Sequence, residues 1–266
     1  HYAPGTLVEF FQRMGMSFGG DTNASTSFDR TQYMLELAHA DAKNIAEGLQ
    51  VLADDAGGLL LLDSEIDKER GIILSEKRTR DNVGFRTFIA QFEFMLGDTL
   101  LPKRIPIGLV EVIEKAPRAR FTEFWDTWYR PEKLTVVAVG DFDPAAVEQQ
   151  IVAMFSPLTA RAPAAPEPVI GTVPSFTGVR TYFHAEPESP ATNVSLTALT
   201  PYVDRPDTAA NRLKDLPRSI ALAMLNRRFS ELVKKEGAPF SAASASVSDG
   251  FRFMRQADVS LTCKPG

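Results

Sequence analysis

Hydrophobic residues near the N-terminus recur first with the period of an amphipathic helix and then with the period of strands. The first group keeps the i, i+3, i+4, i+7 spacing and consists of Leu7, Phe10, Phe11 and Met14. Residues 19–22 break this helix. Residues 23–26 and 31–37 are expected to be extended, and the second run alternates apolar and polar positions. Because turn residues at 27–30 join the two runs, the pattern predicts a β-hairpin.

Apolar stripes of helical period predict further helices before residue 160. They cover about residues 45–52, 64–80, 85–96, 121–128 and 144–155. Paired glycines end the first of these helices. Asp63 or Ser64 is expected to cap the second, and Asp143 followed by Pro144 begins the last. The stripes of Phe and Trp side chains in the third and fourth helices are interpreted as core.

A continuous apolar run at residues 134–139 predicts a strand that is buried on both faces. We expect this strand to lie in the same sheet as residues 31–37. Residues 156–175 then lose all periodicity and accumulate prolines, which is typical of a linker.

Extended and helical patterns return after this linker. Four strands are predicted there, at residues 179–184, 193–199, 240–247 and 251–263. A helix begins at Thr208 and is expected to be interrupted at Pro217. The Ser-Asp-Gly sequence at residues 248–250 predicts a hairpin turn between the last two strands.

The order of these elements predicts an α+β fold, with helices packed on a mainly antiparallel sheet. Because the helix-then-hairpin opening of the first half recurs in the second, we interpret the chain as a repeated unit whose second copy is incomplete. The predicted domains are residues 1–156, a Pro-rich linker at residues 157–175, and residues 176–266.

Composition narrows the classes of function. The 266 residues are 44% hydrophobic and 24% charged, as in an ordinary soluble domain, and no apolar run is long enough to span a bilayer. The net charge of −5 argues against a nucleic-acid partner, because phosphate binding needs a concentrated basic surface. The small basic group at residues 77–80 is flanked by acids and is interpreted as a solvated helix end. The single cysteine excludes an internal disulfide and a cysteine-based zinc site.

Two glutamates in the predicted helix at residues 64–80 are the most informative pair. Seven residues separate Glu69 from Glu76, so both carboxylates fall within about 20° of each other on the helix, on the stripe that carries Ile66 and Ile73. Burying a carboxylate is costly unless a metal, a cation or hydrogen bonds compensate it. The alternative is a solvated stripe edge with pairing to neighbouring cations, and spacing alone favours that alternative slightly.

Short motifs in a fixed order add a second line of evidence. They lie at residues 2–6 with 15–26, 69–76 (ERGIILSE), 106–108 (PIG), 128–134 (WYRPEKL) and 137–143 (VAVGDFD). Together they resemble the pitrilysin/insulinase family of inverted-motif zinc metallopeptidases. The resemblance covers about residues 1–160 well and residues 176–266 loosely.

The resemblance implies a zinc-dependent endopeptidase that cleaves peptides or unfolded polypeptide segments between two halves. In that family the position of Glu76 is the third zinc ligand, and Glu69 is an acid that orients a ligand histidine or tunes the site. Residues Asn23, Ala24, Ser25 and Thr26 match an edge strand to which an extended substrate adds; an ordinary hairpin arm is nearly as good an interpretation. The resemblance also implies a bacterial envelope enzyme, and the periplasm is slightly favoured over the cytoplasm as its location.

One departure from the family pattern is the His-x-x-Glu-His motif, which does not occur in the 266 residues. By the family order it is expected just before His1, so His1 is interpreted as a loop residue, and His39 and His184 as a loop and a strand-end residue. We therefore expect these residues alone to be inactive, with a second peptidase-like half or partner subunit completing the protein. A non-catalytic family member that recognises substrate or serves as a structural subunit is the alternative function, and a plain interaction domain is a third.

Overall fold

The structure is a computed structural model that describes residues 6–17 and 19–264. These residues form two compact units that do not follow chain order. Unit 1 contains the residues up to Thr79 together with Pro106–Pro168, and unit 2 contains Arg80–Ile105 together with the residues from Val169 onward. The predicted domain boundaries at residues 156 and 176 therefore remain a prediction.

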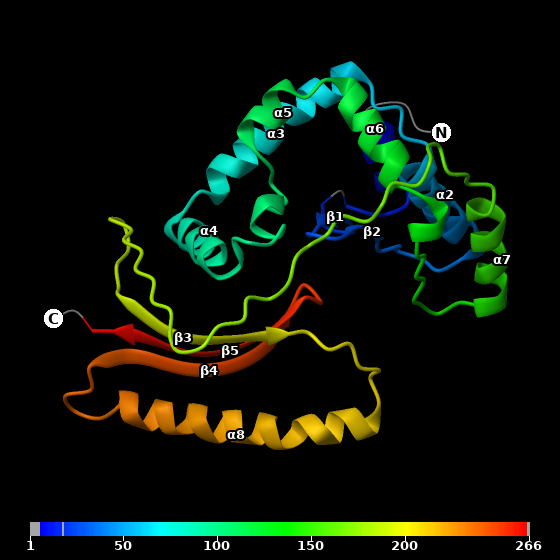
Figure 1. The fold of residues 1–266 in the computed structure, drawn as a ribbon. Helices are drawn as coiled ribbons and strands as arrows, with labels where there is room; N and C mark the ends of the chain where they lie inside the picture. The colour runs from blue at the N-terminus through cyan, green and yellow to red at the C-terminus, as the bar shows by residue number, and fades with distance from the viewer. Residues whose placement is uncertain (1–5, 18, 265–266) are drawn as a thin grey trace. The chain divides into compact units, whose positions relative to one another are not determined.

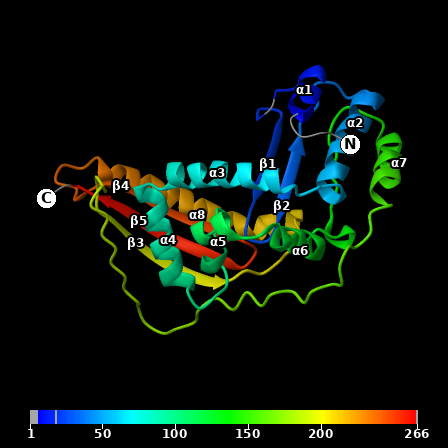
Figure 2. The same cartoon turned by 90° about the horizontal axis from the view of Figure 1, so that it is seen from above.

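Unit 1 consists of helices around a two-stranded sheet (Figures 1 and 2). Its main elements are α1 (Thr6–Arg13), β1 (Thr22–Thr26), β2 (Thr31–Leu35), α2 (Ala42–Gly57), α3 (Asp63–Arg80), α5 (Val110–Lys115), α6 (Arg118–Trp128) and α7 (Pro144–Phe155). The predicted helices and the predicted hairpin all form. β1 and β2 pair antiparallel, with Thr22 opposite Leu35 and Thr26 opposite Thr31.

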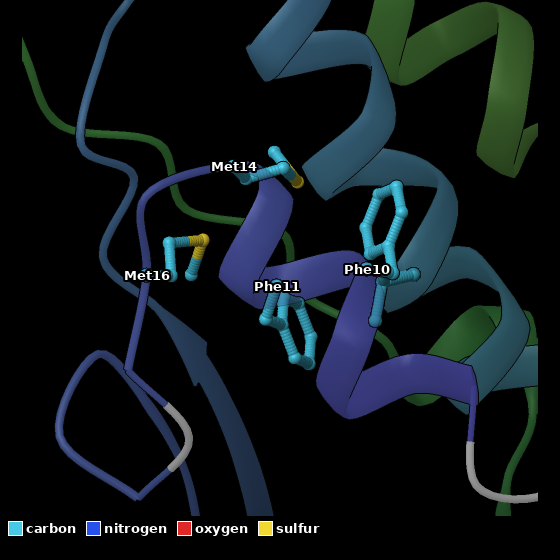
Figure 3. Packing of buried hydrophobic residues seen from close by; sticks show 5 residues of the cluster. Phe10, Phe11, Met14 and Met16 are labelled. Carbon is cyan, nitrogen blue, oxygen red and sulfur yellow. The ribbon is translucent and has the colours of Figure 1, made fainter.

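The core of unit 1 begins where α1 packs beside the hairpin and α2. Figure 3 shows Phe10 and Phe11 on α1, with Met14 and Met16 directly after the helix. Phe11 is only 2% exposed, and Leu35 of the hairpin packs against the same cluster. Burial of these apolar side chains holds the hairpin against the helices.

Local caps and a second apolar cluster join α2 to α7. The Asp41 side chain accepts hydrogen bonds from the backbone N–H groups that begin α2, and Asp143 accepts one from Ala145, as predicted from the Asp-Pro pair. Ile45 and Leu49 of α2 then pack against Val147 of α7, and the two helices lie side by side in Figures 1 and 2.

The strand predicted at residues 134–139 does not form, so its predicted place beside residues 31–37 is wrong. The segment is without regular structure, and Val137 and Val139 are 75% and 91% exposed. Only Val136 packs against the α2–α7 cluster. A strand exists by pairing with another strand, and none in the described part of the chain pairs with this run.

Unit 2 contains a three-stranded antiparallel sheet, with helix α8 along it in Figure 1. Its main elements are α4 (Val83–Leu96), β3 (Asn193–Pro201), α8 (Ala209–Val233), β4 (Phe240–Gly250) and β5 (Met254–Cys263). The strand order is β3-β5-β4. Asn226 of α8 binds the backbone of Ala245 in β4 twice, accepting from its N–H at 2.7 Å and donating to its carbonyl at 2.9 Å.

Two predictions in unit 2 are wrong, one of a strand and one of a helix interruption. Residues 179–184 form no strand; Tyr182 instead stacks on Phe94 of α4 at 4.7 Å, and Phe183 is 86% exposed. Helix α8 runs through Pro217 without interruption. A proline removes one helical N–H donor, and the many remaining hydrogen bonds of this long helix hold it together.

The last hairpin forms, but its turn lies further along the chain than predicted. Phe251 and Arg252 occupy the turn with φ of 56° and 50°, and the Phe253 N–H donates to the Gly250 carbonyl. Three residues, 251–253, separate β4 from β5, and positive φ at both central residues of the Gly250–Phe253 turn matches the twist of a hairpin. Phe251 also meets Phe92 of α4 edge-on at 5.6 Å, which helps to hold an unfavourable backbone.

The aromatic stripes are core only in part. Phe92 and Trp125 are buried, but Phe88 and Phe124 are 41% and 60% exposed. The predicted α+β class is confirmed, with antiparallel sheets and packed helices in both units. No helix in the described ranges is both long enough and apolar enough to cross a membrane.

Candidate active site

Helix α3 carries both glutamates that the sequence singles out, as one uninterrupted helix (Figure 2). It is rich in helix-forming residues, and acidic residues in its first turn favour the helix start. Ile66 is buried, Ile73 is half-buried, and Glu69 and Glu76 are exposed. The seven-residue spacing separates the two glutamate backbones by about 10 Å along the axis. In an undistorted helix the two carboxylates therefore lie at different positions along the axis.

The cations of α3 anchor it to the segment that follows residue 106. Arg70 pairs with Asp67 at 3.0 Å and donates to the carbonyls of Ile113 and Ala116. Lys77 donates to the Gly108 carbonyl at 3.2 Å. These contacts go to backbone oxygens and to Asp67, so they position the helix and leave the Glu69 side chain at the surface.

The edge of β1 that faces away from β2 has backbone N–H and C=O groups, at alternate residues, that are not bonded to β2. The Ser27 N–H donates to Arg30, and the Glu36 N–H donates to Asp21, so the odd-numbered positions of β1 bond to β2. The N–H and C=O groups of Thr22, Ala24 and Thr26 consequently point away from β2. The Asn23 side chain accepts the outward Ala24 N–H at 2.8 Å. A peptide that adds here displaces one local hydrogen bond.

A pocket of about 290 Å³ lies beside β1 and was not predicted from the sequence. Its walls come from α1, the hairpin and the last turns of α2, and Asp55 is one of the lining residues. Burial, and then the neighbouring Asp54, raise the pKa of Asp55 to about 6. One signal was present in the sequence: Asp55 follows Leu52 by three residues and so continues the apolar stripe of α2.

The described residues do not form a zinc site by themselves. A glutamate carboxylate such as that of Glu76 is a suitable zinc ligand. However, no group of three His, Cys, Asp or Glu side chains in residues 6–17 and 19–264 could hold a metal ion. His39 is exposed in a loop, and His184, expected at a strand end, lies in an irregular segment and contacts Glu186 at 3.0 Å. His1 and the motif at residues 2–5 lie outside the described residues.

Comparison with known proteins identifies two consecutive domain types. Residues 1–83 match the model of "Insulinase (Peptidase family M16)", and residues 115–260 match "Peptidase M16 inactive domain". The probable zinc protease PqqL of Escherichia coli is 33% identical over 137 residues, which are 52% of this chain and 15% of PqqL. A zinc protease PQQL-like protein of Arabidopsis thaliana is 28% identical over 246 residues, covering 92% of this chain and 26% of that protein.

Solved structures agree with this match. The first half of the periplasmic protease PqqL from Escherichia coli superposes with a TM-score of 0.84 at 25% identity, over 97% of this chain and 55% of that one. The ferredoxin protease FusC, solved in complex with Arabidopsis ferredoxin, superposes with a TM-score of 0.80 at 23% identity and covers 98% of this chain and 29% of that one, which supports the fold alone. The chain thus spans less than two thirds of these relatives. It belongs to peptidase family M16, the pitrilysin/insulinase family.

Proposed function

We propose that the full-length protein containing this chain is a zinc-dependent endopeptidase that hydrolyses peptides or unfolded polypeptide segments. Membership of family M16, whose compared relatives are named zinc proteases, carries the proposal. The presence of Glu69 and Glu76 on one continuous helix supports it, because a family member that had lost its metal would not need both.

Within this proposal, Glu76 is the ligand that the chain contributes to the metal. Its carboxylate is exposed on α3, so protein groups from outside the chain can approach it. The other ligands and the general base are proposed to come from a His-x-x-Glu-His segment that precedes residue 1. Zinc, when bound, supplies Lewis-acid activation of water and of the scissile carbonyl. Glu69 is proposed to orient a ligand or tune the site, since it lies too far along the helix to bind the same ion.

Substrate is proposed to add as a strand to the outer edge of β1. The outward backbone groups of Thr22, Ala24 and Thr26 hold an extended chain of any sequence through main-chain hydrogen bonds. Such binding selects a segment that can become extended, which favours unfolded polypeptides and flexible regions. A second peptidase-like half is proposed to enclose the substrate, as the relation to the first half of PqqL suggests. A periplasmic site of action is proposed on the same basis.

The alternative function is a non-catalytic subunit that recognises substrate. The match of residues 115–260 to a domain described as inactive is the observation that favours it. The deciding experiment is hydrolysis of an unfolded casein substrate by the full-length protein. We expect activity that a chelator removes and stoichiometric zinc restores. Substrate binding without cleavage, in protein with its zinc content verified, would support the non-catalytic alternative.

A further inference from the structure

The pocket beside β1 is formed within unit 1 and has one polar wall. Its apolar walls are the side chains of Leu7, Phe11, Val51 and Leu52. Tyr33 and Asp55 supply the ionisable groups. A volume of about 290 Å³ is at the lower limit for a small-molecule site. The pocket is thus large enough for one amino-acid side chain of a bound peptide and too small for a larger ligand.

The register of the hairpin connects this pocket to the outer edge of β1. Thr22 and Ala24 pair with Leu35 and Tyr33, so these four side chains share one face of the hairpin. That face is the one that packs toward α1 and α2, because Leu35 contacts the α1 cluster and Thr22 is buried. A peptide added to β1 directs alternate side chains to each face. Every second side chain of a peptide bound next to Ala24 therefore lies on the same face of the sheet as the pocket.

The charge of the pocket selects the kind of side chain. Asp55 has no hydrogen bond or ion pair within the described residues, and the pocket lining includes no lysine, arginine or histidine. The groups that act on Asp55 are Asp54 on its own helix and Tyr33 on β2; the Tyr33 hydroxyl lies 3.3 Å from that of Tyr129, directly after α6. None of these supplies a positive charge.

The helix end adds to this preference. Asp55 lies in the last turn of α2, which contains no basic residue. The carbonyl groups at a helix C-terminus favour a cation nearby. A pocket that combines apolar walls with a carboxylate near a helix C-terminus matches a side chain with an aliphatic stem and a cationic end.

We infer that this pocket is a specificity site for a lysine or arginine side chain of the peptide held on β1, with Asp55 as its partner. The inference rests on the proposed function, because it assigns the substrate class of the same edge strand. Ionised Asp55 is otherwise left without a counter-charge in a partly apolar pocket. Binding of a basic side chain satisfies both groups at once.

The test uses the full-length zinc-loaded protein and internally quenched peptides. Each peptide has a uniform Ser/Ala sequence with a single lysine, or a single norleucine in its place, moved through every position. For the wild type at pH 7.5 we expect one position at which lysine raises kcat/KM at least about 10-fold over norleucine, the effect of one charged hydrogen bond. In Asp55→Asn the lysine-to-norleucine ratio at that position should fall to about 1.

Matched variants separate this pocket from a general effect of charge. Asp54→Asn removes the neighbouring carboxylate, which does not line the pocket, and should keep the lysine preference. Asp55→Glu should keep most of it. Wild-type preference should also grow as the pH rises through about 6, where Asp55 ionises, and Asp55→Asn should show no such rise.

The outcomes distinguish this inference from the proposed function. Cleavage of peptides with no lysine preference at any position, or with a preference that Asp55→Asn leaves intact, overturns the inference alone. Failure of the zinc-loaded protein to cleave any peptide overturns the proposed function and the inference with it.

Discussion

Replacing Asp55 with asparagine is expected to stabilise unit 1 at neutral pH and to have no effect at low pH. The carboxyl group is half-buried, next to Asp54, and burial and that charge raise its pKa from 3.8 to about 6. Between these two values the unfolded chain has lost the proton and the folded chain retains it. The free energy of unfolding therefore falls as the pH rises from about 4 to 6, and the loss is complete above the folded pKa.

The magnitude follows from the two pKa values. A tenfold change in proton affinity corresponds to about 1.4 kcal/mol, so the difference between 3.8 and about 6 gives an upper limit of about 3 kcal/mol. The carboxylate retains contact with solvent, which screens it, and we expect about 1–2 kcal/mol. The asparagine side chain would keep the shape of the aspartate without its charge. The variant should be more stable than the wild type by that amount above pH 7.

Intrinsic tryptophan fluorescence is a suitable probe, because both tryptophans, Trp125 and Trp128, lie on α6 in unit 1. Urea unfolding is measured from pH 4 to pH 8 for the wild type and Asp55→Asn. Glu47→Gln, which removes a surface carboxylate from the same helix, is the control and should differ from the wild type by no more than about 0.5 kcal/mol at every pH. A constant difference between Asp55→Asn and the wild type across this range would refute the argument from burial.

Three further predictions concern the two sheets. Ala24→Pro removes an outward N–H of β1 and should abolish peptide cleavage in the full-length protein while the hairpin persists. Ser25→Pro removes an N–H that bonds to β2 and should unfold the hairpin, which hydrogen exchange would show. Asn226→Ala should cost unit 2 about 1–3 kcal/mol, measured by urea unfolding followed by circular dichroism, because the Ala245 backbone loses both partners. Arg252→Gly should raise the stability of the last hairpin by about 0.5 kcal/mol in the same assay, because glycine adopts positive φ without steric cost.

Elements whose causes are local were predictable from the sequence. The amphipathic periods of α1, α2 and α4 and the Asp143 cap of α7 lie within a few residues of the elements they define. The strand prediction for residues 134–139 was wrong because an apolar run becomes a strand only when another strand pairs with it. The strand prediction for residues 179–184 was wrong for the same reason. Tyr182 packs on Phe94, and no strand pairs with this segment in the described part of unit 2.

The candidate site shows the same division. Glu69 and Glu76 were selected by a motif and by their spacing on one helix, which is local information. Asp55 was missed because its pocket combines α1, both strands of the hairpin and α2, and each of these elements contributes only a few of the lining residues. A charged residue that continues an apolar stripe was the single local sign of it.

Zinc content of two variants of the full-length protein tests the central claim most directly. Glu76→Gln and Glu69→Gln are purified side by side with the wild type, and bound metal and peptidase rate are measured for each. Because a neutral amide is a poor zinc ligand, Glu76→Gln should lose most of the metal and nearly all activity, whereas Glu69→Gln should lose about 10- to 100-fold in affinity or rate. Equal, mild losses in the two variants, or a greater loss of zinc from Glu69→Gln, would contradict the assignment of Glu76 as the metal ligand.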